Sequence, residues 1–206
     1  MEVKLNLRDR IVGCARDLFF KMGLRRVTMD DIAGKCGVSK KTIYQHFKDK
    51  DTVVLEVTKE YLHQEEHDLQ KIHESAKDPI EELVSITKWF RDMLANMDIS
   101  LLHDMKKYHP NSWTVFSQHK ENCIFCSMIE NLREGKKLGL YRPELKEEII
   151  SIFRMESTEM LFNSEAFKHT DVEFSDIKME VFEHFVYGIV TEKGKEIFEK
   201  YKRELK

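Results

Sequence analysis

The stretch Thr28–Lys50, TMDDIAGKCGVSKKTIYQHFKDK, decides the fold of this 206-residue chain. Thr28, followed three residues later by Asp31, is the N-cap pattern of one short helix, and Ser39 is a suitable cap for another. Between them, Gly37 can adopt the positive φ that a tight turn between helices requires. The spacing therefore predicts two short helices joined by a brief turn, which is a helix-turn-helix.

The second of these helices, about residues 40–47, separates apolar from polar side chains. Ile43 and Phe47 are expected to pack inward, so the polar side chains remain outside. Lysines and the free amides at a helix N-terminus bind phosphates, while Gln45 and Thr42 can reach base edges in the major groove. The residues predicted to face DNA are Lys40, Lys41, Thr42, Tyr44, Gln45 and His46.

The run from Thr28 to Lys50 resembles the signature of the tetracycline-repressor (TetR) family. Its most specific part is Tyr-x-His-Phe followed by a lysine three residues on, all after Gly-Val-Ser. The upstream residues Ala15, Leu18, Phe19 and Gly23 match the first helix of that family, so the resemblance covers residues 8–57. Lys41 departs from the small residue usual at that position and adds a positive charge near the phosphates.

This resemblance implies a cytoplasmic, homodimeric transcription factor, usually a repressor, that binds double-stranded DNA. It implies an N-terminal three-helix DNA-binding domain, residues 1–50, and a C-terminal helical domain for effector binding and dimerisation, residues 51–206. It also implies that Thr28 and Lys50 contact phosphates. The helix that follows, residues 50–75, would transmit effector binding to the recognition helix.

Charge is distributed unevenly along the chain. Residues 1–55 hold 12 basic and 7 acidic side chains, a charge of +5, whereas the remainder holds 22 basic and 30 acidic ones, a charge of −8. A basic head on an acidic body indicates a polyanion-binding module joined to a part that does not bind polyanions.

The rest of the sequence predicts an all-α fold of nine or ten helices, because only three prolines and eight glycines interrupt residues that favour helices. Apolar residues recur at helical spacing, and no strand alternation is present. Four of the expected helices end at Gly23, Gly37, Ser75 and Asn96. Further helices are expected over 99–108, 112–134, 144–166 and 173–190, and a short helical tail is expected after 193. Residues 168–176 are the best candidate for a loop.

Two features of the C-terminal part predict partners. The helices near 144–166 and 173–190 have apolar faces that are too large to be left exposed to water. We therefore expect these helices to join two copies of the chain, with Gly188 permitting close approach of the helices.

An aromatic and methionine-rich middle region could line an effector pocket, although the same residues also suit an ordinary hydrophobic core. The candidate lining residues are Trp89, Phe90, Met93, His103, Tyr108, Trp113, Phe116, Phe125 and Met128.

Other functions have less support. No phosphate loop, nucleophile elbow or framed carboxylate pair is present, so we expect no enzyme and no cofactor. Cys123 and Cys126 are expected to lie with His119 on one side of a helix. This spacing leaves one alternative function open, that of a helical protein that senses redox state or a metal through Cys123 and Cys126. Their neighbours are mostly apolar, however, and we expect no metal. A second alternative is a regulator that answers to a protein partner. The absence of a long apolar run favours a cytoplasmic protein without a membrane span.

Overall fold

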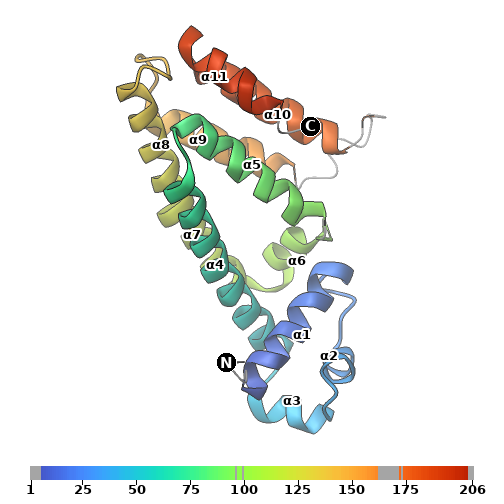
Figure 1. The fold of residues 1–206 in the computed structure, drawn as a ribbon. Coiled ribbons are helices and arrows are strands. Elements are labelled where there is room, and N and C mark those ends of the chain that lie inside the picture. The colour runs from blue at the N-terminus through green and yellow to red at the C-terminus, as the bar shows by residue number, and fades with distance from the viewer. Residues whose placement is uncertain (1–5, 96, 99, 162–171, 173, 204–206) are drawn as a thin grey trace. The chain divides into compact units, whose positions relative to one another are not determined.

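The structure is a computed structural model that describes residues 6–95, 97–98, 100–161, 172 and 174–203. These residues form helices and connecting turns, with one isolated bridge between Tyr141 and Val190, which confirms the predicted all-α class (Figure 1). The helices are α1 (Leu7–Met22), α2 (Met29–Cys36), α3 (Lys40–His46), α4 (Lys50–Ser75), α5 (Pro79–Ala95), α6 (Leu101–Tyr108), α7 (Pro110–His119), the π-helix η1 (Lys120–Ile124), α8 (Phe125–Lys137), α9 (Glu147–Met160), α10 (Phe174–Ile189) and α11 (Glu192–Lys202).

The chain forms two compact units. The first unit comprises residues 1–65 and 96–118, and the second comprises residues 66–95 and 119–206. Helix α4 contributes its N-terminal part to the first unit and its C-terminal part to the second. The domain limits implied by the family resemblance, 1–50 and 51–206, remain a prediction.

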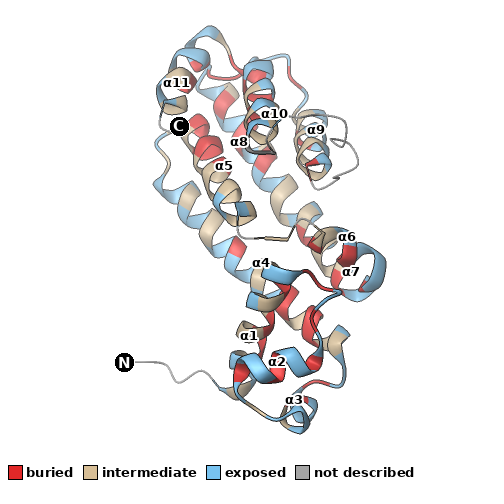
Figure 2. Ribbon diagram, turned by 90° about the vertical axis from the view of Figure 1, so that its right-hand side faces the viewer, coloured by how far each residue is buried: buried red, intermediate tan, exposed pale blue. Residues whose placement is uncertain are grey.

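The first unit is built around the helix-turn-helix. Ile11, Phe19, Ile32 and Ile43 have no solvent exposure, and Phe47 is almost fully buried beside them (Figure 2). The predicted burial of Ile43 and Phe47 is thus confirmed. Residues far along the chain complete this core: Leu101 and Met105 of α6 are buried in it, and Trp113 and Phe116 of α7 pack against it.

The second unit has its own apolar core, in which α5 packs against α8, α10 and α11. Its largest fully buried side chains are Tyr141, Phe182, Phe198, Ile80, Leu132 and Ile189. The C-terminal tail, expected to be a short helix after residue 193, is longer than predicted. It is an eleven-residue helix, α11, because Phe198 buries its ring completely in this core.

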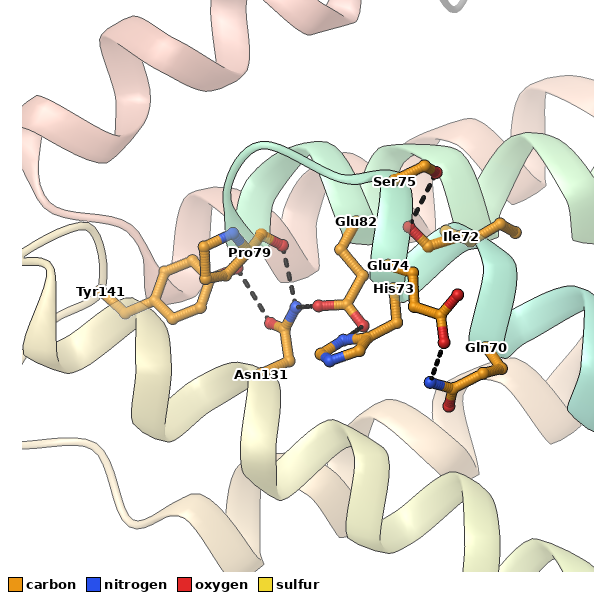
Figure 3. A network of polar contacts seen from close by, with 9 residues as sticks. All are labelled: Gln70, Ile72, His73, Glu74, Ser75, Pro79, Glu82, Asn131 and Tyr141. Atoms are coloured by element: carbon orange, nitrogen blue, oxygen red, sulfur yellow. Dashed lines mark hydrogen bonds and ion pairs between the residues drawn. The ribbon is translucent and has the colours of Figure 1, made fainter.

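A buried polar network fixes the end of α4 to α5 and α8 (Figure 3). The Asn131 amide donates to the Pro79 carbonyl at 2.9 Å and to a Glu82 oxygen at 2.7 Å, and its own oxygen accepts from the Tyr141 hydroxyl at 3.0 Å. The second Glu82 oxygen lies 3.0 Å from His73 Nδ1 on α4. Because each of these buried groups has a partner, the network orients three helices at little desolvation cost.

Two predicted helix limits are corrected. The helix predicted over 112–134, with Gly135 and Gly139 as its stops, continues through Gly135 to Lys137. The Tyr141 ring packs directly on Gly135, where an added Cβ would lie 2.1 Å from a ring carbon. The left-handed Gly139 follows the end of the helix. Upstream, the predicted 112–134 helix is interrupted by the π-turn η1. The loop expected over 168–176 lies mostly outside the described residues, and α10 begins at Phe174.

Candidate nucleic-acid interface

The turn between α2 and α3 is fixed by local hydrogen bonds. The Asp31 carboxylate accepts from the Thr28 backbone amide at 2.8 Å, and the Asp31 amide donates to the Thr28 hydroxyl oxygen at 3.2 Å, which completes a capping box. These bonds from Thr28 hold the pKa of the Asp31 carboxyl below its usual value. Gly37 adopts φ +68°, and the Ser39 hydroxyl oxygen caps α3 by accepting from the Thr42 amide at 3.0 Å. The helix-turn-helix predicted from the sequence is therefore present.

Helix α3 presents a polar outer face. Ile43 is fully buried, whereas Lys41, Tyr44, Gln45 and His46 are exposed. We call this set, together with Lys40 and Thr42, the α3 face. Thr42 is half-buried, and its hydroxyl lies 2.8 Å from the Ser39 hydroxyl. Lys40 is exposed, but its ammonium group lies 2.8 Å from the Asp30 carboxylate of α2. The structure thus brings all six predicted residues to one short helix.

The two residues outside α3 have different surroundings. Thr28 is exposed, and its hydroxyl donates to Asp31 at 2.6 Å. The Lys50 ammonium group donates to the Leu24 backbone carbonyl and lies 6.0 Å from the Phe19 ring centre. Partial burial lowers the pKa of Lys50. In this structure Lys50 therefore ties the start of α4 to the start of the α1–α2 connection.

Comparisons with known proteins identify this interface. Residues 11–57 match the family model described as bacterial regulatory proteins, tetR family. The transcriptional repressor KstR2 of Mycolicibacterium smegmatis is 26% identical over 156 residues, which cover 73% of this chain and 75% of that protein. The chain belongs to the TetR family of transcriptional regulators. It is therefore a DNA-binding regulator, as the sequence predicted.

Solved structures share the fold of this TetR-family chain over most of its length. A TetR-family regulator from Agrobacterium tumefaciens superposes with a TM-score of 0.75 at 16% identity, covering 90% of this chain and 98% of the other. The regulator FadR from Bacillus subtilis, solved in complex with stearoyl-CoA, gives a TM-score of 0.65 at 17% identity, covering 88% and 98%. At these identities the likeness shows the fold.

Within the first unit of this TetR-family chain, residues 97–98 and 100–118 pack against the helix-turn-helix. The sequence did not predict this contact. The Asp98 amide donates to the Phe20 carbonyl at 2.6 Å. The buried His109 places Nδ1 2.8 Å from the Asp51 carboxylate, and the Arg25 guanidinium stacks over the Tyr108 ring at 5.1 Å. These contacts connect residues more than fifty positions apart, so no local pattern reveals them.

The nine residues proposed to line an effector pocket fall in both units, and their role stays a prediction. His103, Tyr108, Trp113 and Phe116 belong to the first unit, where Trp113 and Phe116 pack on the core of the helix-turn-helix. The second unit contains the other five, namely Trp89, Phe90, Met93, Phe125 and Met128. A small cavity in the second unit lies between α5, α9 and α10, with room for about one water molecule, and only Phe90 of the predicted set lines it.

The two cysteines predicted to share one helix face differ in exposure and in partners. Cys126 is exposed, whereas the Cys123 thiol donates to Glu66 of α4 at 3.3 Å, and His119 Nδ1 lies 3.3 Å from the same carboxylate oxygen. Among the described residues, Glu66, His119 and Cys123 are the one group whose atoms lie close enough together to hold a metal ion, within 4.8 Å of one another. Of the helices that the structure describes, none is long and apolar enough to cross a membrane.

Proposed function

We propose that this chain is a ligand-responsive repressor that binds a near-palindromic DNA site as a homodimer. The observation that carries the proposal is the α3 face, where Lys41, Tyr44, Gln45 and His46 are all exposed on a capped helix while Ile43 anchors it. An exposed polar face on the second helix of this motif is the arrangement that enters the major groove.

Five of the six residues of the α3 face, all but Lys40, have the following roles in the proposal. Lys41 contacts a phosphate, since its ammonium group is exposed. Gln45 and Thr42 read base edges, and Tyr44 and His46 contact the sugar-phosphate backbone beside them. Thr28 presents the N-terminus of α2 to a second phosphate. Lys50 remains a predicted phosphate contact, but to make one it must leave the Leu24 carbonyl.

Dimerisation is proposed through α9 and α10. Ile149, Ile152, Phe153 and Met160 form a stripe on α9, and each is 41% to 58% exposed in the single chain. Such a stripe is costly in water and is typical of a helix that packs against a partner. A twofold dimer places its two recognition helices about 34–36 Å apart, one turn of DNA, and therefore requires a site with near-palindromic halves.

Effector control is proposed through the second unit. The cavity between α5, α9 and α10 includes Phe90 and Arg91, which lie just before the segment 96–118 that packs in the first unit. A ligand that changes α5 therefore acts on the helix that precedes this segment in the chain. FadR of Bacillus subtilis, which shares the fold, was solved with bound stearoyl-CoA, and this supports effector binding here.

A footprinting experiment tests the proposal. The purified chain, incubated with fragments of its own genome, is expected to protect a short site with two similar inverted halves. Protection of only a single half-site, or of no sequence at all, would contradict the proposed dimeric repressor.

The same experiment tests the two alternative functions. If the DNA site stays protected in the presence of chelators and thiol-blocking reagents, a redox or metal sensor at Cys123 and Cys126 is excluded. If no small molecule changes protection, control by a protein partner is favoured instead.

A further inference from the structure

Three side chains with different donor atoms meet in the second unit. His119 at the end of α7, Cys123 of the π-helix η1 and Glu66 of α4 each offer one donor atom, and these atoms lie within 4.8 Å of one another. All three residues belong to the second unit. An imidazole nitrogen, a thiolate sulfur and a carboxylate oxygen are the ligand types that Zn²⁺ takes in proteins. This group therefore has the chemistry of a zinc site.

The distances between the three donor atoms suit ligands around one ion. A single Glu66 carboxylate oxygen lies 3.3 Å from His119 Nδ1 and 3.3 Å from the Cys123 sulfur. An ionic N–H···O hydrogen bond is typically about 2.7–2.9 Å long, so the contact with His119 is longer than such a bond. Around a tetrahedral Zn²⁺, with bonds of about 2.1 Å to nitrogen and oxygen and about 2.3 Å to sulfur, the donor atoms lie about 3.4–3.6 Å apart. Two of the three separations are close to these values, and rotation of the Cys123 side chain closes the third.

The backbone at these ligands is a π-helix, which is rare in proteins and occurs frequently at functional sites. His119 directly precedes η1, and Cys123 lies within it, four residues further on. Cys126 is exposed and is not in the group of close donor atoms among the described residues. The third ligand comes instead from α4, where Glu66 is 57 positions away from Cys123. No local sequence pattern predicts this set of three.

The burial of the three side chains suits an ion that enters from solvent. The His119 side chain is only 7% exposed, Cys123 is half-buried and the Glu66 side chain is 47% exposed. An ion at this position therefore has protein on the imidazole side and solvent on the carboxylate side. Three protein ligands leave one tetrahedral position open, and a water molecule can occupy it.

We propose that Glu66, His119 and Cys123 bind one Zn²⁺, with water as the fourth ligand. In this structure the Cys123 thiol donates its proton to Glu66. When Zn²⁺ binds, the S–H bond breaks, the sulfur keeps the electron pair and binds the metal, and the proton leaves to solvent. The metal thereby fastens α4 to η1 within the second unit. This site is separate from the α3 face and does not depend on the proposed effector control.

Isothermal titration calorimetry of the full chain with Zn²⁺ tests the site. With thiols kept reduced and near neutral pH, we expect one ion per chain at micromolar affinity or tighter. Titrations in buffers of different ionisation enthalpy should show about one proton released for each ion bound, because the Cys123 thiol must lose its proton. Mg²⁺, which takes oxygen ligands, should not bind. Absence of Zn²⁺ binding, or equal binding of Mg²⁺, would overturn the proposal.

Co²⁺ in place of Zn²⁺ identifies the sulfur ligand, because a thiolate bound to Co²⁺ gives a charge-transfer band in the near ultraviolet. Cys123→Ser should remove this band. Cys126→Ser makes the same change at an exposed cysteine three residues further on and should keep it. Loss of the band in Cys126→Ser, or its survival in both variants, would place the ion elsewhere, and the proposal would be wrong.

The carboxylate ligand is tested by a variant that keeps the side-chain shape. Glu66→Gln removes the charge at an exposed position, so the chain should fold normally. Loss of a group that merely supports a ligand already weakens metal binding about 10–100-fold, so this variant should bind Zn²⁺ at least about tenfold more weakly. Glu74→Gln, at an exposed glutamate on the same helix, is the matched control and should bind like the parent. Equal Zn²⁺ affinities of the two variants would show that Glu66 is not a ligand and would overturn the proposed site.

Discussion

The Lys40 ammonium group lies 2.8 Å from the Asp30 carboxylate, so the first residue of the recognition helix is paired with a residue of the helix before it. This hydrogen bond raises the pKa of Lys40. Both side chains are more than half exposed, so the pair is easily opened by solvent. Asp30 therefore competes with DNA phosphates for Lys40.

Removing this competitor should strengthen DNA binding. In Asp30→Asn, Lys40 is free to contact a phosphate, so affinity at low salt should rise for every duplex, and the salt dependence should steepen by about one unit of slope. Fluorescence anisotropy at several salt concentrations measures both. Asp17→Asn makes the same charge change at a carboxylate 3.9 Å from Lys35, away from α3, and is the control. Equal effects of the two variants would assign the gain to net charge instead of Lys40.

The left-handed turn predicts opposite effects for two neighbouring glycines. Gly37 has φ +68° and open space around its Cα, so Gly37→Ala should destabilise the fold by about 1–2 kcal/mol through backbone strain alone. Gly34 lies inside α2, also in open space, so Gly34→Ala should stabilise it by about 0.5–1 kcal/mol. Urea unfolding of both variants measures the difference. Two changes of the same sign would mean that the turn geometry is misassigned.

Stability of the second unit should depend on the protonation of His73. The hydrogen bond with Glu82 raises the pKa of His73 above its usual value, and Glu130 and Glu134 of α8 add to the shift. A raised folded-state pKa means that this stabilisation is complete below about pH 6.5, the unfolded value, and is lost as pH rises through the folded value. The side chain is half exposed, so the loss should be at most about 1 kcal/mol.

Thermal unfolding between pH 5.5 and 8.5 checks this dependence. His73→Gln keeps a donor for Glu82 but does not titrate, so its curve should lack the decline that the parent shows over this range. His67→Gln, an exposed histidine on the same helix, should retain the decline. A parent protein that becomes more stable as the pH rises would show that the sign of the His73 contribution is wrong.

The proposed dimer interface is tested by one charge on α9. Phe153 is 58% exposed in the single chain, so Phe153→Glu should change the stability of the folded chain little. The same substitution should weaken dimer association at least about tenfold for each copy of the chain that carries it. Sedimentation at micromolar concentration should show monomers, and affinity for the palindromic site should fall. Leu138→Glu, an exposed leucine at the end of α8, should remain dimeric. A stable monomeric parent protein would contradict the proposal outright.

The sequence predicted the helix-turn-helix because its signals are local. Caps at Thr28 and Ser39 and the turn at Gly37 act over three or four residues, and the structure contains all three. Contacts between distant residues were not predictable in this way. The continuation of α8 through Gly135 depends on the Tyr141 ring, and the docking of His109 depends on Asp51, 58 positions away. The small cavity of the second unit likewise arises only when α5, α9 and α10 meet.

The most direct test of the central claim, that the α3 face reads DNA, compares Lys41→Gln and Gln45→Ala on the protected site and on unrelated duplexes across a range of salt. Lys41→Gln should weaken binding to all duplexes and reduce the salt slope by about one unit, because one phosphate contact is lost. Gln45→Ala should keep the slope and instead reduce discrimination between the site and its point variants by about 1–3 kcal/mol at one base pair. If both variants bind every duplex with the affinity, slope and discrimination of the parent, the α3 face is not the DNA-reading surface.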